Sequence, residues 1–151
     1  MHNYWEKDGI HARLVTRAII KDTAGRYFFE RRPLNSEFSP NRLQLFGGKV
    51  DLEDTSLEVA LVRELIEELN IQANHILSVE HIGAELSPDG WWLTYFFIVT
   101  LVDKVLEQLT AVDNLEILNQ DELKIESRSI IDEHRGGDIA FDHGTIVLEN
   151  L

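Results

Sequence analysis

Hydrophobic residues occur along the chain in short runs, and most of these runs predict β-strands. Residues 11–21 (HARLVTRAIIK) and 27–32 (YFFERR) are rich in β-branched and aromatic residues and flank the turn sequence DTAG, so they predict a hairpin. Residues 76–86 and 91–102 predict a second, longer hairpin around the turn sequence SPDG. Shorter extended segments are expected at 43–46 and 117–119.

The hydrophobic pattern changes to a helical period after Thr55. Thr55 with Glu58 three residues later predicts a capping box, so the helix is expected to start at Ser56. Asn70 tolerates the left-handed conformation that often ends a helix. At about 100° per residue one arc of this helix is apolar and is expected to be buried; its members are Val59, Val62, Leu65, Ile66 and Leu69.

Two further helical segments are expected near the C-terminal end, at 120–126 and at 143–151, the second capped by Asp142. Strands on both sides of a central helix, with another helix at the end, indicate α/β or α+β packing around one sheet. A chain of 151 residues with 44% hydrophobic content is expected to form a single domain, 1–151.

The composition of the chain limits where in the cell the protein is expected and which kinds of site it can have. No apolar run approaches the roughly 20 residues that span a bilayer, and the first residues do not have the pattern of a secretory signal. Because the chain has no cysteine, disulfides, zinc–thiolate sites and thiol catalysis are excluded. The expected location is cytoplasmic, without contact to a membrane.

The formal net charge of -13 disfavours DNA or RNA as a partner, since the 14 Lys and Arg residues are spread along the chain. A small phosphate-bearing molecule remains compatible with this charge if carboxylates hold a divalent cation, which would reverse the local sign. The sequence is compatible with either a monomer or a homodimer.

One arc of the central helix concentrates charge. With Arg63 as the zero, Glu67 lies at about 40°, Glu64 at about 100° and Glu68 at about 140°. The ordinary explanation is a solvated face with pairs such as Arg63 and Glu67. Three like charges in one patch are unfavourable unless a cation or solvent screens them, which favours a metal site.

The segment 47–71, GGKVDLEDTSLEVALVRELIEELNI, resembles the signature of the Nudix hydrolases, G-x5-E-x7-R-E-U-x-E-E-x-G-U, in which U is aliphatic. The run 63–69 matches the core of this signature, Ile71 its final aliphatic residue and Gly48 its first glycine. The resemblance implies an α/β/α sandwich with a mixed central sheet. It extends more loosely over most of the chain through the order of the predicted elements.

The chain departs from the signature at three positions. Asp54 stands where the family has glutamate, it is nine residues before Arg63 instead of eight, and Asn70 replaces the late glycine. Both Asn and Gly accept a positive φ, so the third change is mild. The extra residue leaves open which acid pairs with Arg63: Asp54 is expected, with Glu53 and Asp51 as alternatives.

The resemblance implies a Mg²⁺ site, with Mn²⁺ as a substitute cation. Glu64 and Glu68 are the expected direct ligands, with Glu67 close behind and the backbone carbonyl of Gly48 completing the shell; such oxygen donors suit Mg²⁺. Arg63 is expected to orient the helix and the loop through Asp54. The general base is expected from the signature, as Glu67, or from Glu116, which could also be an additional ligand. The alternative for Glu116 is an exposed loop acid.

Substrate contacts are expected from Arg31, Arg32 and Phe38. The arginines follow a predicted strand and could bind phosphate, or could simply extend into solvent. Phe38 could stack on a base. Trp91, Trp92 and Tyr95 could also stack, but neighbouring strand residues point to opposite faces, so Trp91 and Trp92 cannot both do so. Core packing is expected for most of these four aromatic residues.

The implied reaction is attack of water on a phosphorus of a nucleoside diphosphate linked to another group, in a nucleoside triphosphate, ADP-ribose or a nucleotide sugar. The alternative is a catalytically weak Nudix module that senses nucleotides. The complete set of three carboxylates favours the enzyme, and the absence of an additional basic domain weighs against a transcriptional regulator.

Overall fold

The computed structural model describes residues 1–37, 40–109, 111–125 and 143–151. Within them, eight strands form one mixed sheet. The strands are β1 (Tyr4–Lys7), β2 (Ile10–Asp22), β3 (Tyr27–Arg31), β4 (Leu43–Gln44), β5 (Phe46–Lys49), β6 (Ile76–Leu86), β7 (Trp92–Leu101) and β8 (Leu115–Leu118). The helices are α1 (Leu57–Leu69), α2 (Leu106–Leu109) and α4 (Gly144–Glu149), with 3₁₀ turns η1 (Ala73–His75) and η2 (Asp103–Val105). Residues 120–125 are also helical.

The long strand β2 organises the sheet. Its 13 residues pair along one edge with three short antiparallel strands in succession, β1, β5 and β3. Along its other edge β2 pairs in parallel with β7, which forms an antiparallel hairpin with β6. Strand β8 lies antiparallel to β3. The sheet is therefore mixed, and both predicted hairpins are present.

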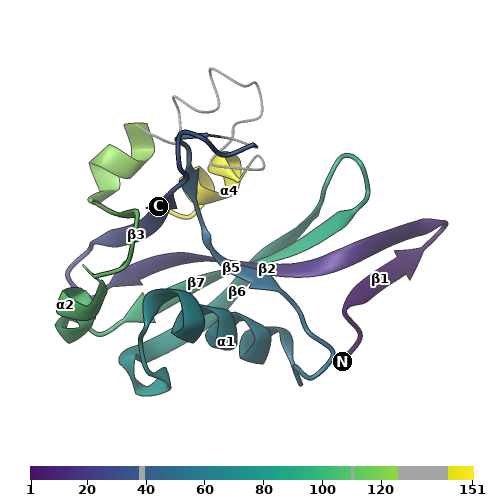
Figure 1. The fold of residues 1–151 in the computed structure, drawn as a ribbon, viewed down its shortest axis with the longest axis horizontal. Helices are drawn as coiled ribbons and strands as arrows, with labels where there is room; N and C mark the ends of the chain where they lie inside the picture. Colours follow the sequence, from purple (N-terminus) through teal and green to yellow (C-terminus); the bar gives the residue numbers. More distant parts are fainter. Residues whose placement is uncertain (38–39, 110, 126–142) are drawn as a thin grey trace.

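Helices cover both faces of this sheet, with α1 on one side and α4 on the other (Figure 1). Alternate residues of β2 point to opposite faces. Ile20 therefore packs in the core that contains Leu61 and Leu65 of α1, while Ile19 packs in the core that contains Val147 of α4. This is the α/β/α sandwich that the sequence led us to expect.

Helix α1 begins one residue later than predicted. The cap is Ser56, whose hydroxyl accepts a hydrogen bond from the Val59 amide at 3.1 Å, and Thr55 does not hold that position. The capping box with Glu58 was therefore wrong. The end of the helix was predicted correctly, because Asn70 adopts the left-handed conformation with φ 54°.

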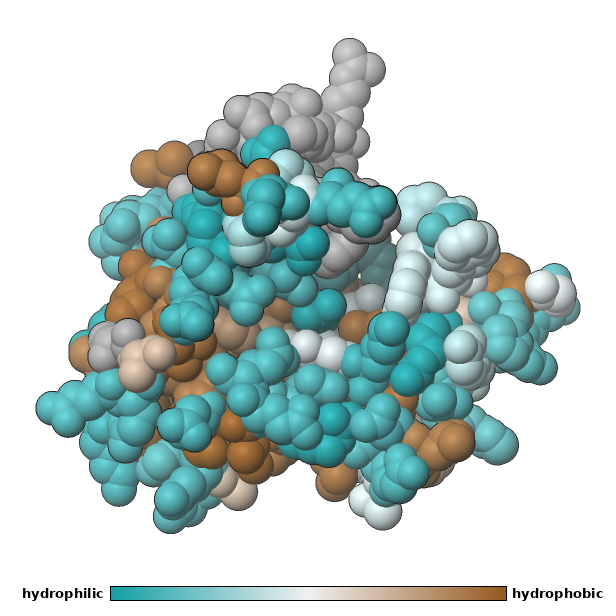
Figure 2. Space-filling model, viewed as in Figure 1, coloured by the Kyte–Doolittle hydropathy of each residue, from teal (hydrophilic) through white to brown (hydrophobic). Residues whose placement is uncertain are grey.

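The predicted buried face of α1 was wrong in part. Leu65 and Leu69 are buried, together with Ala60 and Leu61, whereas Val59 and Ile66 are 46% and 37% exposed. The helix is rotated so that the side carrying the glutamates 64 and 68 lies along β5, which leaves Val59 and Ile66 facing away from the sheet. Figure 2 shows a surface that is mostly hydrophilic on this view, with separate hydrophobic areas.

Strand β5 was only partly predicted, because the extended segment was expected to end at Phe46, before Gly47 and Gly48. They instead pair with β2, opposite Arg17 and Thr16. A Cβ atom on Gly47 would lie 2.1 Å from the carbonyl oxygen of Thr16, so glycine lets the strands approach, and the φ of 139° favours glycine as well.

Strand β1 and helix α2 were not predicted, because both are short and β1 is held by its pairing with β2. The predicted cap Asp142 lies outside the described residues. Of the helices described, none is long and apolar enough to cross a membrane.

Candidate active site

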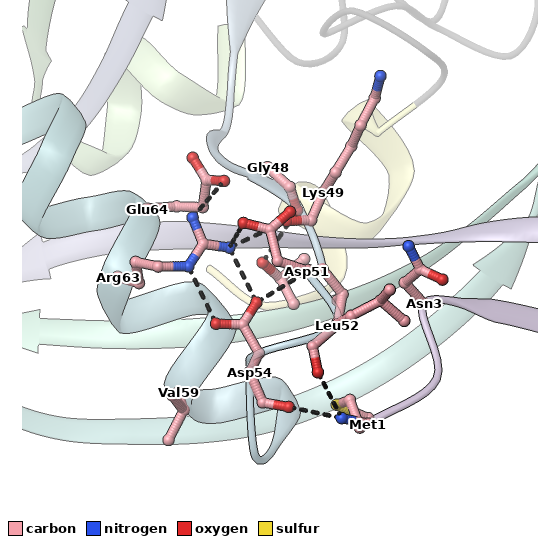
Figure 3. A network of polar contacts seen from close by, with 12 residues as sticks. Met1, Asn3, Gly48, Lys49, Asp51, Leu52, Asp54, Val59, Arg63 and Glu64 are labelled. Atoms are coloured by element: carbon pink, nitrogen blue, oxygen red, sulfur yellow. Dashed lines mark hydrogen bonds and ion pairs between the residues drawn. The ribbon is translucent and has the colours of Figure 1, made fainter.

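Arg63 joins helix α1 to the loop that follows β5. Its Nε and Nη2 donate to the two carboxylate oxygens of Asp54, both at 2.9 Å, and Nη2 also donates to the Lys49 carbonyl at 3.2 Å. Nη1 donates to Glu64 at 3.1 Å, and Nη2 lies 3.3 Å from a carboxylate oxygen of Asp51. Figure 3 shows the guanidinium group facing Asp54 and the loop. The two-pronged bond to a carboxylate fixes helix and loop relative to each other.

Asp54 is buried, with 3% of its surface exposed. The hydrogen bonds from Arg63 hold the pKa of this carboxyl below its usual range, against the effect of burial. The same carboxylate accepts from the Asp51 amide at 2.8 Å, and the Asp54 amide donates to the Asp51 carbonyl. Leu52 and Glu53 within this turn are exposed, and the additional residue of the chain lies after the turn, between Asp54 and Arg63.

Gly48 lies directly against Glu64. A Cβ atom at position 48 would be 2.4 Å from the carboxyl carbon of Glu64 and 2.6 Å from each of its oxygens. The φ of Gly48 is not positive. The requirement for glycine here is therefore the space that the carboxylate occupies. Glu64 and the Gly48 backbone are neighbours because α1 packs on β5.

Glu68 lies one turn further along α1 and accepts a hydrogen bond from the Gly47 amide at 3.2 Å. Burial raises the pKa of Glu68 to about 7, while the Gly47 amide and Arg17 act in the opposite direction and Glu64 adds to the increase. A carboxyl group with this pKa lacks a fully compensating positive charge, which a bound cation would provide.

Arg17, on β2, is a site residue that the sequence pattern did not reveal. Its Nη1 donates to the carbonyls of Leu45 and Gly47, both at 3.2 Å. Burial lowers the pKa of Arg17, and the carboxylates of Glu68 and Glu64 oppose this. It lies in the middle of a hydrophobic strand, so only the pairing of β2 with β5 brings it to the glutamates.

Three glutamates and a backbone carbonyl supply the hard oxygen donors that Mg²⁺ prefers. Glu67 is the most open of the three, with its side chain 60% exposed and 3.6 Å from Arg63. In the part of the chain that the structure describes, no three His, Cys, Asp or Glu side chains already converge as a metal site. The oxygen donors, and the close approach of the Glu64 carboxylate to Gly48, fit a cation site. The glutamate side chains have to rotate for their oxygens to converge on one ion.

Of the remaining predicted residues, Arg31 and Glu116 lie on the sheet, at β3 and β8. Glu116 is on β8, and its carboxylate is 3.4 Å from Nε of Arg31. Nη1 of Arg31 donates to the Asn41 carbonyl, and Nη1 of Arg32 donates to Gln44. These contacts tie Glu116 to Arg31 instead of to α1. Phe38 lies outside the described residues.

The NUDIX domain model matches residues 11–133. The chain therefore belongs to the Nudix family and is a hydrolase of the kind that acts on phosphorus anhydride bonds. None of the curated proteins matches the sequence.

Solved structures share the fold. A mutT/nudix family protein from Listeria innocua is 21% identical with a TM-score of 0.68, covering 97% of this chain and 93% of that protein. The NUDIX domain of Shewanella oneidensis NrtR complexed with ADP ribose is 17% identical, with a TM-score of 0.62 and coverage of 98% and 92%. The Ap4A hydrolase of C. elegans is 14% identical, with a TM-score of 0.55 and coverage of 90% and 98%.

Proposed function

We propose that this single-domain protein is a Mg²⁺-dependent pyrophosphohydrolase that cleaves a nucleoside diphosphate linked to another group. The observation that carries the proposal is the Arg63–Asp54 clamp, which fixes α1 to the loop that follows β5, beside the contacts of Glu68 with Gly47 and of Glu64 with Gly48. Preorganised charged groups on rigid elements are what a phosphoryl-transfer site requires.

In this proposal Glu64, Glu67, Glu68 and the Gly48 carbonyl hold the cation. When bound, the cation would neutralise phosphate charge and lower the pKa of the attacking water. Arg63 keeps the helix and the loop in register and does not contact substrate. Water attacks phosphorus, the P–O–P bond breaks, and the leaving phosphate group takes the bridging oxygen.

The proposal assigns the general base to Glu67 first and to Glu116 second. Glu67 is exposed and shares a helix with the other glutamates, whereas Glu116 is paired with Arg31. Arg31 and Arg32 remain candidates for binding phosphate. If Glu67 is the base, Glu67→Gln lowers kcat much more than Glu116→Gln does.

The test is a substrate panel of nucleoside triphosphates, ADP-ribose and nucleotide sugars with Mg²⁺ or Mn²⁺, run with wild type, Glu68→Gln and Glu58→Gln. Glu58 is exposed in the first turn of α1 and serves as the matched control. We expect at least one substrate to turn over and Glu68→Gln to lose about 100-fold or more in kcat. Absence of turnover with every substrate, or full activity of Glu68→Gln, would falsify the proposal.

Metal binding is measured separately by thermal shift. At a concentration of 100 times Kd, a cation stabilises the folded state by about 2.7 kcal/mol. Mg²⁺ at millimolar concentration should therefore raise the Tm of the wild type and raise that of Glu68→Gln less. An unchanged Tm of the wild type would count against the cation site.

The second candidate is a nucleotide-sensing module. Its support is the shared fold with the NUDIX domain of NrtR, which was solved with ADP ribose. A sensor would bind ADP-ribose in a calorimetric titration without hydrolysing it in the presence of Mg²⁺, whereas the hydrolase releases products.

A further inference from the structure

A pocket of about 350 Å³ lies on the sheet at the end that carries the β1–β2 hairpin. In Figure 1 this hairpin and the turn between β6 and β7 extend toward the same side of the molecule. The pairing register explains the convergence, since Arg13 of β2 lies opposite Tyr4 on one side and Trp92 on the other. The pocket is lined by Tyr4, His11, Arg13, Lys49, Trp91 and Trp92.

The aromatic side chains of this pocket are unusually open to solvent. Trp91 is 69% exposed, Tyr4 43% and Trp92 38%. Neither tryptophan is therefore a core residue, although core packing was expected for most of the four aromatic residues considered for stacking. Both line the same pocket because Trp91 still belongs to the turn and only Trp92 begins strand β7. Large exposed aromatic groups gathered in one hollow are typical of ligand sites.

The two tryptophans are held in place by their backbone. The Trp91 amide donates to Asp89 at 2.9 Å, and the Trp91 carbonyl accepts from the Arg13 amide at 2.8 Å. The Trp92 amide donates to the hydroxyl of Ser87 at 3.0 Å. A turn that is fixed in this way costs a ligand little ordering entropy when it binds.

The pocket is also cationic within an acidic protein. The Lys49 ammonium lies 5.4 Å from the centre of the Trp92 ring, and the Arg13 guanidinium 5.4 Å from the centre of the Tyr4 ring. Arg13 already donates to the carbonyls of Asn3 and Val50, so its role is structural. Among the described residues Lys49 forms no ion pair, which leaves its ammonium group available for an anion.

Lys49 connects the pocket to the glutamate site. Its carbonyl accepts from Arg63, and it follows directly after Gly48, against which Glu64 packs. Its side chain leads in the other direction, away from the guanidinium group of Arg63 (Figure 3) and over Trp92. A ligand that spans from Trp92 past Lys49 to Glu64 would carry an aromatic ring at one end and a diphosphate at the other.

We infer that the pocket binds the nucleobase of the substrate, stacked on Trp92 and Trp91, with Lys49 holding the phosphate that adjoins the nucleoside. The inference rests on the proposed function and narrows the substrate to nucleotides whose base enters this pocket. Cationic ligands are disfavoured because Lys49 and Arg13 place two positive charges beside the aromatic rings of the pocket. The volume suits a base with part of its sugar, at the lower end of the range of about 300 to 1,000 Å³ for ligand pockets.

Calorimetric titration with AMP, GMP, CMP and UMP tests the inference without any need for turnover. Ribose 5-phosphate is the probe that lacks a base. The wild type should bind at least one nucleotide more tightly than ribose 5-phosphate. Trp92→Ala and Trp91→Ala should each weaken nucleotide binding by about tenfold or more, the effect of losing one stacking contact, and should leave ribose 5-phosphate unchanged. Lys49→Ala should weaken both.

Leu77→Ala and Lys104→Ala, at exposed positions outside the pocket, are the matched controls. Thermal melting establishes that each variant is folded. Trp91→Ala should disturb the fold less than Trp92→Ala, because the Trp91 side chain is the more exposed. The inference is overturned if folded Trp91→Ala and Trp92→Ala bind nucleotides like the wild type, or if the wild type binds none of the four. Base-dependent binding that needs the tryptophans, without hydrolysis of any substrate, would support the pocket and refute the hydrolase.

Discussion

Replacing Gly48 by alanine separates the requirements of the fold from those of the site. The new methyl group would lie 2.4 Å from the carboxyl carbon of Glu64, at the far end of a flexible side chain. Glu64 can rotate away, at the cost of its hydrogen bond to Arg63. Because Arg63 is 29% exposed and Glu64 18%, we expect this loss to amount to about 1 kcal/mol or less. The Tm should then fall by no more than about 4 °C.

Gly47 provides the matched comparison one residue away. There the methyl group would lie 2.1 Å from the Thr16 carbonyl and 2.9 Å from the Arg17 Cα, both in the backbone of β2, and the φ is 139°. Forced packing costs about 1 to 3 kcal/mol, and the strained backbone costs a similar amount. We therefore expect Gly47→Ala to lose roughly 2 to 6 kcal/mol, which lowers the Tm by about 4 to 24 °C.

The assay pairs thermal melting with hydrolysis and with Mg²⁺-dependent stabilisation. Gly48→Ala should melt near the wild type yet lose about 100-fold in kcat, as expected when a catalytic group is displaced by about 1 Å, and its stabilisation by Mg²⁺ should decrease. The reasoning fails if Gly48→Ala keeps wild-type kcat and its full response to Mg²⁺. It also fails if Gly47→Ala is as stable as the wild type.

Two further predictions concern stability. Asp54→Asn removes the charge that pairs with Arg63 and should lower the free energy of unfolding, measured by urea denaturation, by about 1 to 3 kcal/mol. Glu53→Gln, in the same turn, should leave the free energy of unfolding unchanged. Equal stability of the two variants would contradict the role of the clamp. Burial lowers the pKa of His143 to about 3, so below a pH of about 6.5 the unfolded chain binds a proton that the folded chain does not, and stability falls as the pH drops toward 3. His143 contributes at most about 1.4 kcal/mol per pH unit to the slope of the unfolding free energy against pH. Urea denaturation between pH 7 and 4.5 should therefore give a smaller slope for His143→Leu than for the wild type. Identical slopes would refute the lowered pKa of His143.

Local patterns and tertiary packing contributed to different parts of this molecule. The span of α1 and the two hairpins could be predicted, because helical period, turn residues and a left-handed Asn70 act over a few residues. Which side of α1 is buried could not. Val59 and Ile66 match the apolar arc as well as Leu65 does, and only the packing of the helix on β5 exposes them.

The primary structure alone was sufficient for the family, for the position of Glu64, Glu67 and Glu68 on one helix and for the pairing of Arg63 with Asp54, because these depend on residue types at fixed spacing along one helix and its adjacent loop. Only the tertiary structure shows that Arg17 lies near the glutamates and that Gly48 contacts Glu64. It also shows that Trp91 and Trp92 line a pocket instead of packing in the core. These depend on the register of β2 with β1, β5 and β7, which joins residues far apart in the chain. Pairing register follows from the energy of the whole sheet, so no local pattern of residues contains it.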